Sequence, residues 1–172
     1  MLWKLRMFWD RLEPAALVFF AVVALVIGGL AAAMFEVFAD RDARAARERQ
    51  LHANSLACLA RNVYFEARGE PLAGQYAVAE VTLNRRGWGP FSMTVCEVVY
   101  APGAFSWTAQ RRLPDPAGPA WETAQQVAEA VYSHRHVPTV HGARYYHAVY
   151  VKPDWAREKR RVGRIGNHIF YR

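Results

Sequence analysis

Residues 56–84 carry two helical patterns of apolar positions with a break between them. In the first pattern, the apolar residues at helical spacing are Leu56, Leu59, Ala60 and Val63. The segment Gly69-Glu70-Pro71 interrupts the period, because Gly admits a positive φ and Pro lacks the N–H that would continue a helix. The period resumes at Leu72 and runs to Leu83. We therefore predict two helices that meet at a corner, the first capped by Asn54 or Ser55.

The remaining chain alternates between short patterned segments and turn-rich connections. Turn residues fill 85–90, and residues 93–100 fit either a short helix or a strand. Three prolines and a glycine make residues 113–119 a loop. Residues 121–133 form an amphipathic helix whose inward residues are Ala124, Val127, Ala128 and Val131. Residues 143–151 alternate as a strand, and residues 165–170 are expected to close a small β element.

The segment 15–35 contains no charged residue and is long enough to cross a bilayer as a helix. We predict an uncleaved anchor there, preceded by an interfacial cytoplasmic segment, 1–14, and followed by a charged, alanine-rich helical spacer, 36–54. A cleaved signal peptide ending near Ala31-Ala32-Ala33 is the competing interpretation. Lys and Arg are nearly balanced on the two sides of the segment, so charge alone does not orient it.

The charge and cysteine content narrow the class of protein only slightly. A chain of 172 residues with a formal charge of +7 has room for one domain plus a short segment, and it favours an anionic partner. Nucleic acid, lipid headgroups and cell-wall polymer all satisfy that condition. Two cysteines are too few for a disulfide scaffold.

Glu66 is the candidate for acid catalysis. It lies near the C-terminal end of the first predicted helix, where the helix dipole disfavours a carboxylate, and the neighbouring Tyr64 and Phe65 can desolvate it. A carboxyl group kept partly neutral near pH 7 is what protonation of a glycosidic oxygen requires. The alternative is a surface carboxylate paired with Arg61 or Arg68.

Residues across most of 56–172 resemble the SleB/CwlJ-type cell wall hydrolases, which cleave peptidoglycan. The matching segments are 60–70 (ARNVYFEARGE), 74–75, 77–85 (AVAEVTLNR), 91, 94–96, 98–100, 105–107, 143–147, 153, 155–156 and 165–170. The resemblance implies a mainly α (α+β), lysozyme-like or lytic transglycosylase-like catalytic domain over 55–172. It also implies that Glu66 is the essential acid.

The same resemblance implies a set of substrate-binding residues around the glycan cleft. They are Gln75, Ser106, Trp107, Tyr145, Tyr146 and His147. An aromatic face can stack on a sugar ring, and hydroxyl and imidazole groups can bond its substituents. For Trp107 and His147, a structural role in the core is the competing interpretation.

Cys58 and Cys96 are expected to form a disulfide if the domain is extracytoplasmic, and otherwise to be buried free thiols. His134-Arg135-His136 with His141 is the one cluster with metal-ligand spacing, but it has no carboxylate nearby in sequence. We therefore expect neither a metal nor a cofactor.

These observations favour a membrane-anchored enzyme that cuts peptidoglycan glycan strands outside the cytoplasmic (inner) membrane. A hydrolase normally needs a second carboxylate, and the candidates are Glu70, Glu80, Glu97, Asp115 and Asp154. Only Glu70 lies close to Glu66 in sequence, and we expect it to cap the corner or to pair there with Arg68 or Arg85. A lone acid fits a lytic transglycosylase. Lysozyme-like hydrolysis, amidase action and a non-catalytic wall-binding module remain alternatives. We expect no nucleic-acid partner, and the oligomeric state stays open.

Overall fold

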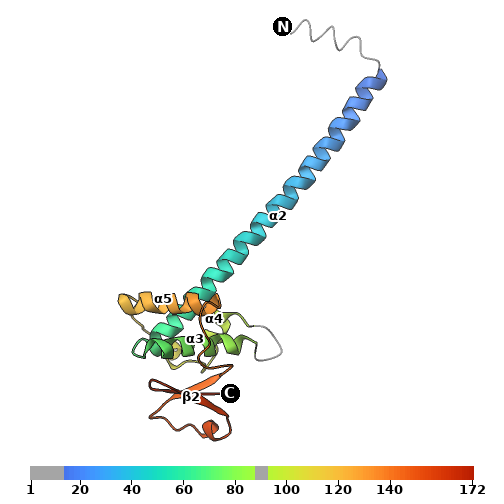
Figure 1. Ribbon diagram of the computed structural model, residues 1–172. Coiled ribbons are helices and arrows are strands. Elements are labelled where there is room, and N and C mark those ends of the chain that lie inside the picture. The colour runs from blue at the N-terminus through green and yellow to red at the C-terminus, as the bar shows by residue number, and fades with distance from the viewer. Residues whose placement is uncertain (1–13, 88–92) are drawn as a thin grey trace. The chain divides into compact units, whose positions relative to one another are not determined.

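The structure is a computed structural model that describes residues 14–87 and 93–172. It is mainly helical with one small sheet, as the sequence predicts (Figure 1). The elements in chain order are α2 (Pro14–Ala67), α3 (Leu72–Arg86), α4 (Val95–Tyr100), η1 (Ser106–Ala109), α5 (Pro119–Tyr132), β1 (Tyr145–Ala148), η2 (Asp154–Arg157), β2 (Arg161–Ile165) and β3 (His168–Tyr171). The interfacial segment 1–14, except Pro14, and residues 88–90 of the expected turn lie outside the described residues. Residues 85–86, also expected in that turn, belong instead to α3.

Helix α2 is continuous from Pro14 to Ala67, so the predicted N-cap at Asn54 or Ser55 is wrong. Residues 40–54 contain no Gly or Pro, and nothing in this alanine-rich stretch interrupts the helix. The chain divides into two units between Arg49 and Gln50. By length and composition alone, α2 contains a stretch that could cross a membrane, a property that signal sequences share.

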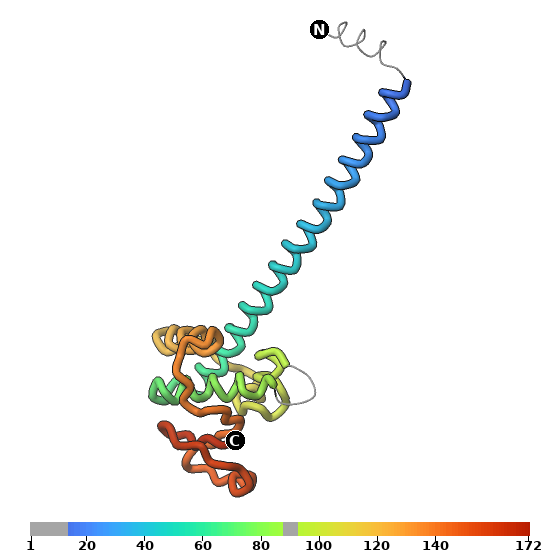
Figure 2. The backbone as a smooth tube through the Cα atoms, turned by 45° about the vertical axis from the view of Figure 1, so that its right-hand side comes forward, coloured from blue at the N-terminus to red at the C-terminus, as the bar shows by residue number. Residues whose placement is uncertain are grey.

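Within residues 50–172, helix α3 is the central element of the helical layer. It contacts α4 and α5 and also reaches β2 (Figure 2). The predicted inward face of α5 is confirmed, because Ala124, Val127, Ala128 and Val131 are all at most 1% exposed. They pack in one apolar core with the C-terminal turns of α2 and with α4. This core holds the last turns of α2, and therefore Glu66, in a fixed orientation.

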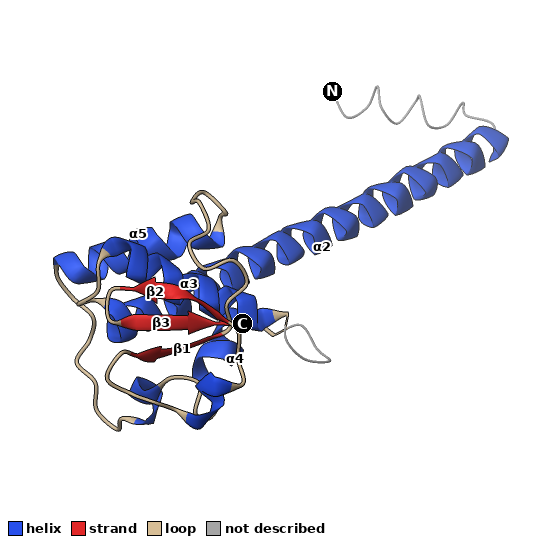
Figure 3. Ribbon diagram, turned by 60° about the horizontal axis from the view of Figure 1, so that its bottom comes forward, coloured by secondary structure: helices blue, strands red, loops and turns tan. Residues whose placement is uncertain are grey.

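The sheet is antiparallel, with strand order β1-β3-β2 (Figure 3). Tyr146 of β1 lies opposite Phe170 of β3, and the fully buried Phe170 packs with Ala77 and Val81 of α3. Because side chains alternate along a strand, Tyr146 is on the face turned to the helices while Tyr145 is on the other. The sheet thus places one tyrosine of the pair against the helical layer.

The corner between α2 and α3 is bound to the β2–β3 turn through Glu70. The Glu70 carboxylate accepts hydrogen bonds from the Asn167 backbone N–H at 2.8 Å and from the Asn167 side chain at 3.2 Å. Of the two alternatives expected for Glu70, the ion pair with Arg68 or Arg85 is therefore wrong. Arg68 lies instead over the Tyr64 ring, and Arg85 donates to backbone carbonyls elsewhere. The Glu70 carboxylate binds the β2–β3 turn because the backbone N–H of Asn167 in that turn points at the corner.

Candidate active site

A cavity of about 410 Å³ opens beside the end of α2. Its lining residues come from α2, α3, the start of η1 with the loop before it, β1 with the residues after it, and β3. They are Phe65, Glu66, Arg85, Ala104, Phe105, Ser106, Tyr146, His147, Ala148, Tyr150, Val151 and His168. Glu66 is the single carboxyl group among these described lining residues. The tertiary structure therefore brings together residues up to about a hundred positions apart around one acid.

Glu66 is fixed by a hydrogen bond from the sheet. The Tyr146 hydroxyl donates to Glu66 Oε2 at 2.8 Å. Burial raises the pKa of Glu66 above its ordinary value, and the Tyr146 hydrogen bond and the charge of Arg85 offset only part of that rise. Burial and the nearby carboxylate together push the pKa of Tyr146 well above its ordinary value, so its phenol stays a donor. The salt bridge to Arg61 or Arg68, the alternative for Glu66, is absent from the described residues.

Arg85 is the cation of the cavity, and it is half-buried on α3. Its guanidinium donates to the Arg144 carbonyl at 2.7 Å and to the Ala104 carbonyl at 3.4 Å, and it lies over the Phe105 ring. Burial lowers the pKa of Arg85, and the nearby acid groups of Tyr146 and Glu66 counter that effect. With its position fixed by two carbonyls, Arg85 can stabilise a Glu66 carboxylate when the proton has left.

The structure brings three of the six expected substrate-binding residues into this cavity. Ser106 is exposed at its rim, and Tyr146 and His147 line it. The His147 ring nitrogens lie 2.9 Å from the Ala148 carbonyl and 2.9 Å from the Tyr171 hydroxyl. His147 is therefore held by the sheet, and its ring packs against Trp155 and Tyr171.

The other three expected residues lie elsewhere. The Trp107 ring is 4% exposed, stacks on Phe65, and donates its N–H to Asn62 Oδ1 at 2.9 Å. A ring covered on its faces cannot stack on a sugar, so the expectation for Trp107 is corrected to a core residue. Gln75 is buried at the corner, where its amide donates to the Glu70 carbonyl at 3.2 Å. Tyr145 packs against Trp155 on the opposite face of the sheet.

Two lining residues, Arg85 and His168, were not recognised as site residues from the sequence. Burial lowers the pKa of His168, whose ring packs edge-on against Tyr146. Its Nδ1 is buried and has no hydrogen-bond partner among the described residues. Both residues belong to the segments that carry the family resemblance, but nothing in their spacing distinguishes a lining residue from a packed one.

The structure joins Cys58 of α2 to Cys96 of α4 by a disulfide, with a Cα–Cα distance of 5.3 Å. This confirms the expected pairing. The histidine cluster is organised differently from a metal site. His136 Nε2 lies 3.1 Å from Glu80, whose carboxylate also accepts from Thr139 and Val140. Within the described part of the chain, no group of three or more His, Cys, Asp or Glu is placed to hold a metal ion.

A family model described as Cell Wall Hydrolase matches residues 69–171. The chain belongs to the cell wall hydrolase family. This confirms the resemblance drawn from the sequence motifs. The matched range begins three residues after Glu66, so this match does not itself include the candidate acid. Arg85, Tyr146 and His168 lie inside the range.

Curated relatives of this cell wall hydrolase include spore cortex-lytic enzymes. The one from Oceanobacillus iheyensis is 34% identical over 120 residues, covering 68% of this chain and 41% of the relative. The one from Bacillus subtilis is 34% identical over 118 residues, covering 68% of this chain and 37% of the relative. The chain thus spans less than half the length of these relatives.

Two solved catalytic domains share the fold of this hydrolase. That of the Bacillus cereus SleB protein has a TM-score of 0.55 at 32% identity, covering 70% of this chain and 91% of that chain. That of the germination-specific lytic transglycosylase SleB from Bacillus anthracis has a TM-score of 0.59 at 32% identity. The match covers 69% of this chain and 94% of that chain. The helical domain with its small sheet is therefore a SleB-type catalytic fold.

Proposed function

We propose that this cell wall hydrolase is a lytic transglycosylase that cuts the β-1,4 bond between N-acetylmuramic acid and N-acetylglucosamine in peptidoglycan. The observation that carries the proposal is the single carboxyl group, Glu66, among the described residues that line the cavity. An inverting or retaining hydrolase uses a second carboxylate roughly 5–9.5 Å from the acid.

Of the five candidates for that second role, Asp115 does not line the cavity, and the other four have partners elsewhere. Glu70 accepts from Asn167, Glu80 from Thr139 and Val140, and Glu97 from Thr94 in a capping box. Asp154 pairs with Arg157 at 2.6 Å. With these groups occupied, a reaction that needs one acid and no activated water is the better fit to the cavity.

In the proposed reaction Glu66 acts twice. Protonated Glu66 donates its proton to the leaving oxygen of N-acetylglucosamine as the bond from that oxygen to the muramoyl C1 breaks. The resulting carboxylate then takes the proton of the muramoyl 6-hydroxyl as O6 bonds to C1, which closes a 1,6-anhydro ring. Glu66 ends protonated, and no water is consumed. Tyr146 and Arg85 stabilise the carboxylate between the two steps.

The second part of the proposal concerns the location. We place residues 15–35 across the cytoplasmic membrane as an uncleaved single-pass anchor, with residues 36–54 as a spacer and the catalytic domain 55–172 on the outer side. The charge-free apolar segment supports a membrane span, and the Cys58–Cys96 disulfide supports an oxidising compartment. N-terminal sequencing of the membrane fraction tests the anchor, because a chain starting after Ala33 would mean a cleaved signal.

Product analysis tests the reaction. The full chain in detergent, Glu66→Gln, and the exposed control Glu158→Gln are incubated with purified sacculi. We expect 1,6-anhydromuramic ends from the wild type and the control, and a loss of at least a hundredfold in Glu66→Gln. Reducing ends would mean lysozyme-like hydrolysis, and free stem peptides would mean amidase action. Undiminished muropeptide release by Glu66→Gln would remove Glu66 from the reaction.

A further inference from the structure

A second cavity with a basic lining, of about 340 Å³, lies outside the Glu66 site. Its lining residues are His141, Gly142, Arg144, Tyr145, Lys159 and Arg172. No acidic side chain is among these described residues. The ion pairs within the described part of the chain also leave out Arg144, Lys159 and Arg172. Three cations without a carboxylate partner in an ion pair therefore line one polar cavity, and two of them, Arg144 and Lys159, are half-buried.

Both cations are held in place before any ligand arrives. Arg144 is half-buried, and its Nε donates to the Asn84 carbonyl at 3.4 Å. Lys159 is also half-buried, with its Nζ 4.9 Å from the centroid of the Tyr145 ring. A long side chain that is already restrained loses less conformational entropy when it binds an anion. This distinguishes the pair from the exposed Lys152 and Arg160 of the C-terminal region.

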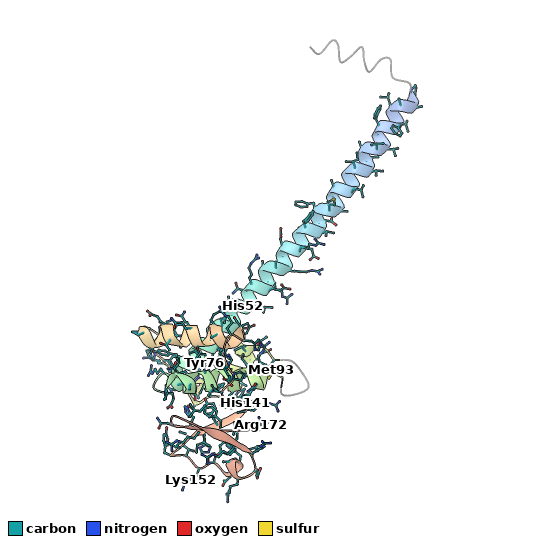
Figure 4. The ribbon with its side chains drawn as sticks, viewed as in Figure 1. His52, Tyr76, Met93, His141, Lys152 and Arg172 are labelled. Carbon is teal, nitrogen blue, oxygen red and sulfur yellow. A yellow bond between two sulfur atoms is a disulfide. The ribbon has the colours of Figure 1, made fainter. Side chains whose placement is uncertain are left out.

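A third cavity of about 260 Å³, called the intermediate cavity, has lining residues in common with both the basic cavity and the Glu66 cavity. It shares Arg85 and Ala104 with the Glu66 cavity and Tyr145 with the basic one. Its other walls are mostly apolar: Met93, Val98, Ala101, Pro102 and Gly103. The Arg85 guanidinium donates to the Arg144 carbonyl at 2.7 Å, so a residue of the catalytic cavity touches one of the basic cavity. Figure 4 labels Met93 of the intermediate cavity and His141 and Arg172 of the basic one.

We propose that the basic cavity binds a free carboxylate of the peptide stem of peptidoglycan while the sugars occupy the Glu66 cavity. This rests on the proposed function. The stem is attached to the muramoyl sugar at the cleavage site, and two to four extended residues span roughly 7–14 Å. Its alkyl groups suit the apolar walls of the intermediate cavity, and its carboxylates suit Arg144 and Lys159. The lining residues that the intermediate cavity shares with the other two are the reason for assigning the anion and the sugars to one substrate.

A comparison of two substrates tests this assignment. We measure kcat/KM of the full chain in detergent on glycan strands that keep their stems and on strands from which the stems have been removed. The ratio of interest is kcat/KM on strands with stems divided by kcat/KM on strands without stems. Lys159→Gln and Arg144→Gln each remove one charge-assisted hydrogen bond to the stem. Each is therefore expected to raise KM on strands with stems and to lower the ratio about tenfold. Lys152→Gln is the matched control, because Lys152 is exposed and is not a lining residue of any of the three cavities.

The ratio separates this proposal from the proposed function. A ratio that stays at the wild-type value in both variants, or an equal loss on both substrates, would overturn peptide recognition without affecting glycan cleavage. Circular dichroism and the unfolding temperature confirm that each variant is folded.

A second measurement does not depend on cleavage. A free stem tripeptide is titrated calorimetrically into the full-length Glu66→Gln chain, with and without Lys159→Gln. Binding that weakens about tenfold with Lys159→Gln supports the assignment even if the wild type cuts no glycan. Unaltered peptide binding together with weaker retention on phosphatidylglycerol vesicles would assign the cations to lipid and overturn it.

Discussion

The hydroxyl of Tyr146 donates a hydrogen bond to Glu66 Oε2 at 2.8 Å, and the two residues are 80 positions apart in the chain. The bond joins strand β1 to the last turn of α2. It lowers the pKa of Glu66 while burial raises it, and burial is the larger effect. Tyr146 thus orients the acid and stabilises the carboxylate that remains after the proton has been given up.

Tyr146→Phe keeps the ring and removes this hydrogen bond. Because the bond favours the carboxylate, the pKa of Glu66 is expected to rise further, and kcat on sacculi to fall about 10- to 100-fold. The measurement is the pH profile of kcat in both proteins. An unshifted profile with wild-type kcat would show that Tyr146 does not act on Glu66.

The pH dependence of activity follows from the raised pKa of Glu66. The first step needs the protonated acid, so the activity is expected to fall as pH rises through that pKa. The descending limb of kcat/KM should therefore lie above the ordinary glutamate value of 4.5. A limb at or below 4.5 would mean that the acid is well solvated.

The same shift has a consequence for stability. A carboxyl group whose pKa is higher in the folded state binds more protons there than in the unfolded state. Its contribution to the free energy of unfolding is complete below the unfolded pKa and is lost as pH rises through the folded pKa. Urea titrations across this pH range should show that the free energy of unfolding falls less with rising pH in Glu66→Gln than in the wild type. An equal fall in the two proteins would contradict the raised pKa.

Gly166 is expected to tolerate no side chain. Its φ is +58°, and a Cβ there would overlap Glu70 Oε2 and lie 2.9 Å from Pro71 Cδ. Gly166→Ala should lower the free energy of unfolding by about 1–3 kcal/mol and loosen the contact between the corner and the β2–β3 turn. Gly69→Ala is the control, because a Cβ at Gly69 meets no atom within 4 Å. Equal midpoints in urea for the two variants would contradict this reading of the turn.

The Cys58–Cys96 disulfide closes a loop with a sequence separation of 38. Cys58→Ser with Cys96→Ser is expected to lower the free energy of unfolding by about 3–4 kcal/mol, chiefly through the unfolded chain. Urea unfolding of the wild type under reducing conditions should show the same loss. A reductant that leaves the wild-type midpoint unchanged would indicate that the bond is absent.

Trp107→Phe tests whether Trp107 has a structural role in the core or stacks on a sugar ring of the substrate. Removal of the indole N–H leaves the buried Asn62 Oδ1 without its donor, at a cost of about 1–3 kcal/mol in the free energy of unfolding. Thermal unfolding measures this loss. A variant with wild-type stability and a raised KM would return Trp107 to the binding surface.

The sequence predicted the helices well because their signals are local. The period of α5 and the Gly69-Glu70-Pro71 break each depend on neighbours within a few residues. The N-cap expected at Asn54 or Ser55 failed because a cap residue is only a preference. The residues before it favour helix, so α2 continues past Asn54 and Ser55 without a break.

The sequence by itself determined the helical elements, the apolar segment 15–35, the family motifs and the candidate acid, since each is encoded in residue types at short spacing. Only the tertiary structure decided the surroundings of Glu66. It buried Trp107 away from the cavity, directed Glu70 to Asn167, and brought Arg85 and His168 beside the acid. The physical reason is that burial and hydrogen-bond partners depend on which distant segments pack together, and no local pattern records that choice.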